Sequence, residues 1–313
     1  RAYFMEKGQI RFSGSTKDLL ERPDLLRSVF LSQVNTSPLE TKELSGSTSA
    51  VTLHAEALTR RFGGIQAVSS ISFNVKEKEI VGVMGPNGAG KTTLFDLLSG
   101  FVPVDSGKVQ LQNRDITTSS PAERARFGLG RSFQDARLFP SLTVSETIAV
   151  ALERFTASRN PISAALHLPP TYESEKRVTR QVAELIEVMG LSAYQNKFIG
   201  ELSTGTRRMV DLACVIAHRP LIVLLDEPSS GIAQKEAEAL IPVLHRIRDE
   251  MGSSLVVIEH DIGLLSEISD RFIALDQGSV IARGTPEEVL DDPLVISSYL
   301  GTSKATIQRS GQI

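Results

Sequence analysis

The sequence has no tryptophan, a single cysteine and few aromatic residues among its 313 residues. Aromatic side chains make up 5% of the chain and the formal net charge is −3. Neither a stacking platform nor a basic surface therefore indicates nucleic acid as a partner. The single cysteine, Cys214, excludes an internal disulfide, and the apolar residues around it predict a buried, unreactive thiol.

Long hydrophobic runs are also missing. No apolar stretch approaches the roughly 18 residues that span a bilayer, and residues 1–7 lack the apolar core of a signal peptide. The chain is 41% hydrophobic and 23% charged, which is ordinary for a globular protein. We expect a cytosolic protein that reaches a membrane only through a partner.

The chain is organised around a glycine-rich stretch at residues 85–93, which fits the pattern G-x-x-x-x-G-K-[ST]. It follows the apolar run 80–84 and precedes a helical segment, so the order is strand, turn, helix. Such glycines permit a tight turn whose N–H groups, with the helix N-terminus, bind phosphates. Lys91 would reach the β- and γ-phosphates and the Thr92 hydroxyl would bind Mg²⁺. The alternative is a tight turn without a ligand.

Two acidic residues, Asp226 and Glu227, end the apolar run 221–225. With a phosphate loop upstream, Asp226 is placed to hold Mg²⁺, and Glu227 to orient or deprotonate the water that attacks the γ-phosphate. The alternative is a helix cap or a turn. His260 follows the next buried strand and would lie at the same sheet edge, although a lone histidine is more often structural.

Strand and helix patterns alternate along the chain, with a mostly helical region from 142 to 190, which predicts an α/β core with a helical insertion. Gln134 lies between the core and this region. Ser203 can cap the helix that begins within 202–206, and the free N–H groups there could bind an anion. An ordinary helix cap explains that segment equally well.

The first residues repeat a pattern found near the end. The matched pairs, each 270 residues apart except for the last, which is 269 apart, are Gly8/Gly278, Gly14/Gly284, Pro23/Pro293 and Phe30/Tyr299. We infer that residues 1–33 are the tail of a preceding, similar domain. Residues 34–50, rich in Ser, Thr and Gly, are expected to be a linker, and the next domain to begin near residue 51. The alternative is that a hairpin followed by a helix is a common pattern.

The phosphate loop, Gln134, the segment 202–206, Asp226-Glu227-Pro228 and His260, in this order, resemble the ATP-binding cassette (ABC) ATPases. The resemblance covers about residues 51–301 and leaves 302–313 as a C-terminal tail. It implies an α/β P-loop NTPase fold with a mixed sheet, an antiparallel β subdomain and a helical subdomain at about 135–220.

The same resemblance implies ATP and Mg²⁺ as cofactors and assigns roles to residues. Catalytic roles fall to Glu227 as the carboxylate, His260 as the switch histidine, Lys91 and Gln134. Mg²⁺ would be held by Thr92, Gln134 and Asp226. The ATP-binding residues would be Phe62, which stacks on adenine, with Gly85, Pro86, Asn87, Gly88, Ala89, Gly90, Lys91, Thr92, Thr93, Ser203 and Gly205. Ser203 and Gly205 would face the phosphate loop of a second cassette.

A narrower resemblance lies in the segments 61–68, 131–134 and 137–139, which look like the branched-chain amino acid importer ATPases. The tail at 1–33 resembles the end of the companion ATPase, which suggests a tandem fusion. The partners implied are a second cassette, transmembrane permease subunits and, indirectly, a solute-binding protein. The permease subunits would hold the chain at the cytoplasmic side of the cell membrane.

Three residues depart from the commonest family pattern: Thr204 and Thr206 in the signature segment, and Ala233 where aspartate is usual. All three concern the site shared with a second cassette. Two other functions stay open, a soluble tandem-cassette ATPase acting on ribosomes and a P-loop kinase or GTPase. For a GTPase, no Asn-Lys-x-Asp base-reading motif appears.

Overall fold

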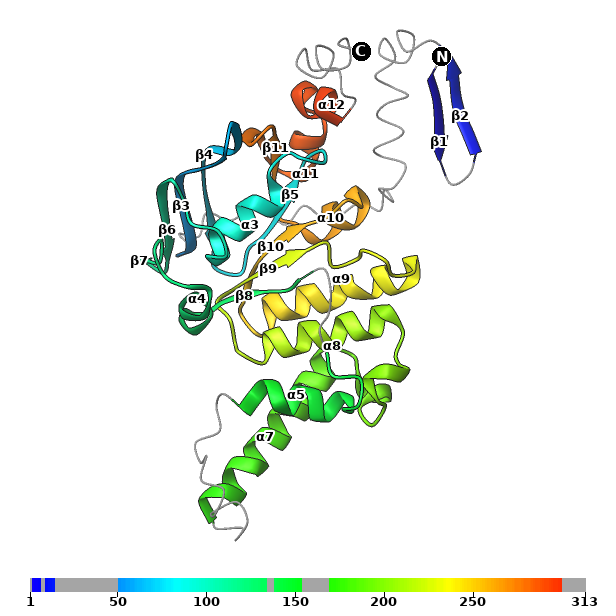
Figure 1. The fold of residues 1–313 in the computed structure, drawn as a ribbon. Helices are drawn as coiled ribbons and strands as arrows, with labels where there is room; N and C mark the ends of the chain where they lie inside the picture. The colour runs from blue at the N-terminus through cyan, green and yellow to red at the C-terminus, as the bar shows by residue number, and fades with distance from the viewer. Residues whose placement is uncertain (1, 7–8, 15–49, 134–137, 154–168, 300–313) are drawn as a thin grey trace.

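The computed structural model describes residues 2–6, 9–14, 50–133, 138–153 and 169–299. Its main sheet runs through the middle of the molecule (Figure 1), and neighbouring strands in it are hydrogen-bonded. From edge to edge the strands are β12 (Ser279–Gly284), β11 (Arg271–Asp276), β5 (Ile80–Met84), β10 (Ser254–Ile258), β9 (Ile222–Asp226) and β8 (Leu129–Arg131). β12 pairs antiparallel with β11 and the other pairs are parallel.

The central strands are continuous apolar runs because both faces of this sheet are covered. Every residue of β5 and β10 is buried, as are the first four of β9. Ile258 at the end of β10 is level with Val83 on one side and Asp226 on the other. The residues that follow these three parallel strands therefore lie close together, at the carboxyl-terminal ends of the strands.

A second, antiparallel sheet lies beside the first, in the order β4 (Ile65–Lys76), β3 (Val51–Phe62), β6 (Ser106–Leu111) and β7 (Arg114–Asp115). Between the sheets lies α3 (Lys91–Ser99), the helix that follows the phosphate loop. Its buried Leu94 and Phe95 belong to one hydrophobic cluster with Leu53 of β3 and Leu224 of β9.

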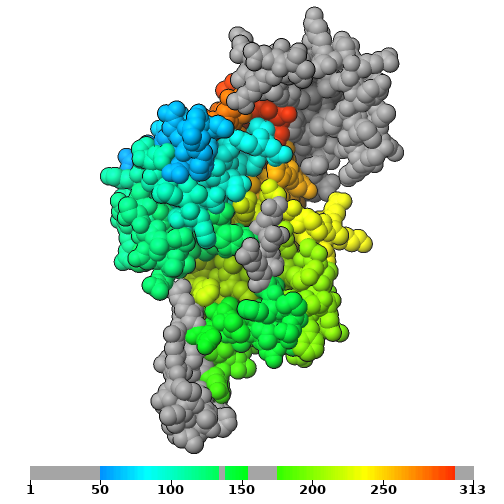
Figure 2. Space-filling model, viewed as in Figure 1, coloured from blue at the N-terminus to red at the C-terminus, as the bar shows by residue number. Residues whose placement is uncertain are grey.

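The helices after β8 form a lobe at the far end of the molecule from the antiparallel sheet (Figures 1 and 2). They are α5 (Val144–Leu152), α7 (Pro169–Val188), η2 (Ser192–Tyr194), η3 (Ile199–Glu201) and α8 (Thr204–Ile216). A helical region was expected here, and residues 154–168 of it lie outside the described part. Cys214 on α8 was expected to be buried, and the structure shows it partly buried. Burial raises the pKa of its thiol to about 12.

Helices complete the remaining connections. They are α4 (Pro121–Phe127), α9 (Gln234–Asp249), α10 (Ile262–Ile268), α11 (Pro286–Leu290) and α12 (Pro293–Tyr299). None of the helices in the described ranges is long and apolar enough to cross a membrane.

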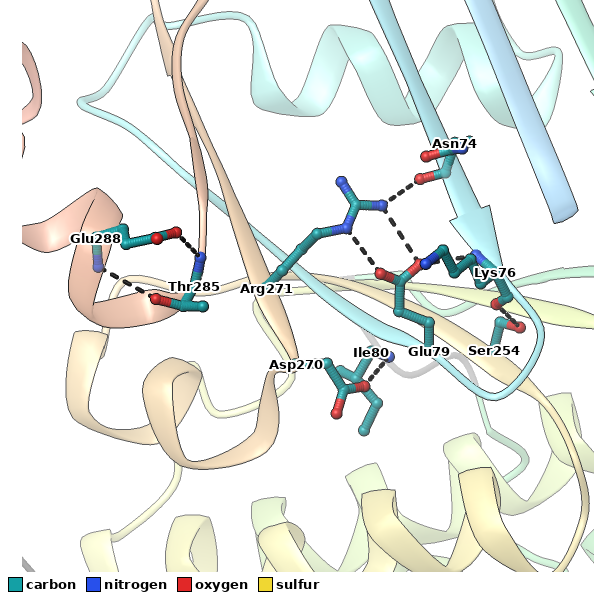
Figure 3. A network of polar contacts seen from close by, with 9 residues as sticks. All are labelled: Asn74, Lys76, Glu79, Ile80, Ser254, Asp270, Arg271, Thr285 and Glu288. Carbon is teal, nitrogen blue, oxygen red and sulfur yellow. Dashed lines mark hydrogen bonds and ion pairs between the residues drawn. The ribbon is translucent and has the colours of Figure 1, made fainter. Parts of the chain in front are cut away.

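Polar contacts fasten β11 to the start of β5 (Figure 3). The Arg271 guanidinium donates to Glu79 Oε1 at 2.7 Å and to the Asn74 carbonyl oxygen. The Asp270 carboxylate accepts the Ile80 N–H at 2.8 Å. The C-terminal part of the chain is therefore joined to the strand that leads into the phosphate loop.

The N-terminal hairpin, β1 (Ala2–Glu6) and β2 (Gln9–Gly14), repeats the backbone pairing of β11 and β12. Ala2 pairs with Gly14, as Phe272 pairs with Gly284, and each further pair matches with the same offset of 270. Even the bulge recurs, between Phe4 and Met5 in one hairpin and between Ala274 and Leu275 in the other. The sequence repeat thus extends to the hydrogen-bonding register.

Arg124 is a fully buried charge that the sequence pattern of α4 did not predict. Its guanidinium donates to the carbonyl oxygens of Leu97 at 2.6 Å and Leu98 at 2.7 Å, and to those of Thr117 and Ser119. Two of these carbonyls, at Leu97 and Leu98, lie at the C-terminal end of α3, where the helix itself supplies few donors. Burial lowers the pKa of Arg124 to about 10, so the side chain stays charged at neutral pH.

Replacing Arg124 should weaken the fold because four carbonyl oxygens would each lose a hydrogen-bond donor. We expect Arg124→Met to lower the free energy of unfolding by about 3 kcal/mol, measured by urea denaturation. Arg126→Met on the exposed face of the same helix is the control and should change it by less than about 0.5 kcal/mol. Equal effects of the two substitutions would contradict this role for Arg124.

Candidate nucleotide site

A polar cavity of about 500 Å³ lies where the phosphate loop meets the edge of the main sheet. It brings together residues from five separate parts of the sequence. Its lining residues are Gly64, Ile65, Gln66, Ala67, Asn87, Gly88, Ala89, Gly90, Lys91, Thr92, Thr93, Glu227, His260 and Gln277. The predicted phosphate loop, carboxylate and histidine therefore share one cavity.

The loop takes its shape from glycines with positive φ, at Gly88 (+81°) and Gly90 (+99°). A Cβ at Gly90 would lie 2.4 Å from the carbonyl oxygen of Ala67, so no larger residue fits there. At Gly88 a Cβ would meet nothing within 4 Å, because this residue borders the open cavity. The N–H groups that begin α3 have no acceptor within their own helix, and an anion in this cavity could accept them.

The Lys91 side chain folds back onto the loop. Its Nζ donates to the carbonyl oxygens of Gly85 at 2.6 Å and Pro86 at 3.1 Å. Burial lowers the pKa of the Lys91 ammonium, while the carboxylates of Glu227 and Asp226 act in the opposite direction. An anion in the cavity would stabilise the charged amine, which a phosphate group could do.

On the acidic side of the site, Glu227 has an unfavourable backbone conformation and Asp226 is a partly buried carboxylate. Glu227 has φ of +50°, in the left-handed region that is unfavourable for a residue with a Cβ. Its N–H donates to the Ile258 carbonyl at 2.9 Å, and its Oε1 lies 2.9 Å from Nε2 of His260. Burial raises the pKa of Asp226, although Arg131, 3.6 Å away, partly compensates.

Burial is the main cause of both pKa shifts, and the nearby charges oppose it only in part. A phosphate group beside Lys91 and a divalent cation beside Asp226 would each favour the charged form of the residue. Thr92 is exposed to the cavity, so its hydroxyl could join Asp226 in holding such a cation. The residues present therefore fit a phosphate–magnesium pair.

Six predicted residues that the structure describes do not line this cavity: Phe62, Gly85, Pro86, Ser203, Gly205 and Asp226. Gly85 and Pro86 come just before the lining residues of the phosphate loop, and Asp226 comes just before Glu227. Ser203 and Gly205 lie at the start of α8, where Ser203 Oγ accepts the Thr206 N–H at 3.1 Å and donates to Glu236 at 2.7 Å. Phe62 is 46% exposed, and the guanidinium of Arg60 stacks on its ring. The distance from the Arg60 Cζ atom to the ring centroid is 4.8 Å. Gln134 lies outside the described residues.

The cavity also has lining residues that the sequence did not predict. Gln66 and Ile65 come from the start of β4, and Gln277 from the turn between β11 and β12. Glycines at positions 63, 64 and 278 mark the two turns that carry these residues. Nothing in the sequence places the turns beside the phosphate loop.

A glycine-rich loop between a buried strand and a helix, with a carboxylate at the end of another parallel strand of the same sheet, defines a P-loop nucleotide-binding protein. The family model described as ABC transporter matches residues 68–230, and that of branched-chain amino acid ATP-binding cassette transporters matches residues 279–305. The chain belongs to the family of ABC transporter ATP-binding proteins.

Curated relatives agree with this membership. The chain is 36% identical over 249 residues to the high-affinity branched-chain amino acid transport ATP-binding protein BraF of Pseudomonas aeruginosa, covering 80% of this chain and 97% of that protein. It is 34% identical to LivG, the protein of the same description from Escherichia coli, with the same coverage. A solved structure, the ADP conformation of the ATP-binding cassette MJ1267, matches with a TM-score of 0.68 at 27% identity, covering 80% of this chain and 99% of that one.

These matches confirm the predicted α/β P-loop fold of an ABC cassette and the prediction that the chain is an ATP-binding, ATP-hydrolysing protein. They also set aside the kinase or GTPase alternative. The individual site residues and the domain boundaries stay predictions, which the geometry above makes specific.

Removing the lysine amine should weaken nucleotide binding, because a buried charge would no longer meet the phosphates. We expect Lys91→Ala to raise the dissociation constant for ATP about 10- to 100-fold in a calorimetric titration. Lys108→Ala, on the exposed surface of β6, is the matched control and should bind like the parent protein. Unchanged affinity in Lys91→Ala would place the nucleotide elsewhere.

Proposed function

We propose that this chain is the ATP-hydrolysing subunit of a membrane importer for branched-chain amino acids or a similar small solute. The observation that carries the proposal is the polar cavity that joins Lys91 on the phosphate loop to the paired Glu227 and His260. The relatives named for branched-chain amino acid transport supply the solute class. None of the relatives reported above is described as acting on ribosomes.

The reaction would be hydrolysis of ATP to ADP and phosphate by in-line attack of water on the γ-phosphate. Glu227 orients the water and accepts its proton, and His260, 2.9 Å from that carboxylate, fixes the orientation of the carboxylate. Lys91 and the N–H groups of the loop bind the phosphates. Mg²⁺, held by Thr92, Asp226 and Gln134, would neutralise charge on the phosphates.

The transmembrane permease subunits are proposed to contact the exposed aromatic pair Phe101 and Phe133. The two rings lie edge to face at 5.4 Å, and Phe101 is 54% exposed and Phe133 47% exposed. Arg131 stacks on both rings and also lies 3.6 Å from Asp226. A partner docked here would therefore be connected through Arg131 to Asp226, the proposed magnesium ligand. The contact would lie on the cytoplasmic side of the membrane. A solute-binding protein would act only through the permease.

A second cassette is proposed to complete the ATP site. Ser203 and Gly205 do not line the cavity of this chain, which fits a role opposite another phosphate loop. The register shared by the N-terminal hairpin and β11–β12 supports the inference that residues 1–33 end a preceding cassette, joined by the linker 34–50. Ala233, where aspartate is usual, is the N-cap residue of α9, and its side chain makes no capping hydrogen bond.

Replacing the proposed catalytic carboxylate should separate binding from turnover. We expect Glu227→Gln to slow steady-state ATP hydrolysis at least about a hundredfold while ATP affinity changes by less than about twofold, since the phosphate cradle is intact. Glu250→Gln, on the exposed end of α9, should leave both unchanged. Normal turnover in Glu227→Gln would refute the role of Glu227.

Coupling to the permease can be tested at the aromatic pair. We expect Phe101→Ala to reduce solute uptake about tenfold in membrane vesicles that contain the assembled transporter. ATP hydrolysis by the chain alone should stay within about twofold of the parent protein, because Phe101 does not line the cavity. Leu294→Ala on α12, at a side chain 59% exposed, is the control. Full uptake by Phe101→Ala would exclude this surface as the docking site.

A further inference from the structure

Tyr299, the last residue of α12, contacts the first residue of the phosphate loop. Its hydroxyl oxygen accepts the Gly85 N–H at 2.8 Å, across 214 positions of sequence. The ring packs against the same hydrophobic cluster as Val295 and β12. This hydrogen bond links α12 directly to the start of the phosphate loop.

Gly85 has almost no freedom on the remaining sides. A Cβ at this residue would lie 2.2 Å from the carbonyl oxygen of Leu275, near the end of β11. Its own carbonyl oxygen accepts the Lys91 ammonium at 2.6 Å. Gly85 is thus enclosed by the β11 backbone, the Tyr299 hydroxyl and the lysine that is proposed to bind phosphate.

The other end of the loop is held from the same C-terminal unit. The Gly278 N–H, in the turn between β11 and β12, donates to the Ala89 carbonyl at 3.0 Å. The Gly278 carbonyl accepts the Ser69 N–H of β4 at 2.7 Å. A single unit, residues 270–299, therefore contacts the loop at both Gly85 and Ala89. Polar contacts in turn fasten this unit to the start of β5 (Figure 3).

We propose that Tyr299 is a positioning residue of the nucleotide site, which fixes the first peptide of the phosphate loop by accepting the Gly85 N–H. The inference rests on the proposed ATPase function and adds a residue to that site. A loop that is already in its binding shape loses less conformational freedom when phosphates bind. Without the hydroxyl, the Gly85 N–H must find another acceptor, and the loop would populate other conformations that bind ATP less well.

Burial favours the neutral hydroxyl at every pH at which the protein would be assayed, since it raises the pKa of Tyr299 to about 12. The N-terminal repeat has phenylalanine, Phe30, at the matching position in the sequence, outside the described residues. The ring is common to the two copies and the hydroxyl is not. Tyr299→Phe therefore removes the proposed function while it keeps the packing.

The test compares Tyr299→Phe with Val295→Ala in the full chain. Val295 is a buried residue of the same helix that packs in the core. We expect Tyr299→Phe to raise the dissociation constant for ATP about threefold to tenfold, and kcat to stay within about twofold. Val295→Ala should lower the unfolding midpoint in urea, yet leave ATP affinity within about twofold of the parent protein.

A second readout needs no nucleotide. Hydrogen exchange of the Gly85 amide, followed by NMR, should be faster in Tyr299→Phe than in the parent protein and unchanged in Val295→Ala. An unchanged ATP dissociation constant in Tyr299→Phe would overturn the proposal. So would an equal loss of affinity in Val295→Ala, because α12 would then act only by packing. Failure of the parent protein to bind ATP would instead refute the proposed function.

Discussion

The geometry of Gly85 is the constraint on which the site depends. This residue passes so close to the Leu275 carbonyl that no side chain fits, and both its N–H and its carbonyl have partners outside the regular sheet pairing. The loop that follows turns through two further glycines with positive φ and opens the N-terminus of α3 to the cavity. Phosphate recognition of this kind uses backbone N–H groups, so the shape of the backbone determines the affinity.

The charged groups of the site are partly buried, and the sign of each charge indicates the ligand that would stabilise it. Burial lowers the pKa of Lys91 and raises that of Asp226, so each charge is disfavoured where it lies. Glu227 is held at a positive φ beside His260. Strain of this kind is typical of functional sites. The proposed nucleotide and cation would bring the opposite charge to each residue.

Much of the fold and of the site could be predicted from the sequence, because short sequence motifs indicate them. The strand–loop–helix order around Lys91 and the acidic pair after an apolar strand each occupy a few consecutive residues. Arg124 and Tyr299 could not be found in this way, since their partners lie 5 to 27 and 214 positions away and only the folded chain brings them together. Gln277 was missed for the same reason, because a hairpin turn carries it to the loop.

The central claim is that the loop is already shaped to bind phosphates. A crystal structure of the Glu227→Gln chain with Mg²⁺ and ATP would test it most directly. The account predicts the triphosphate in this cavity, with the Lys91 amine turned toward it and the Gly85–Tyr299 hydrogen bond still near 2.8 Å. A triphosphate bound elsewhere, or a loop whose backbone had to refold around it, would contradict the account.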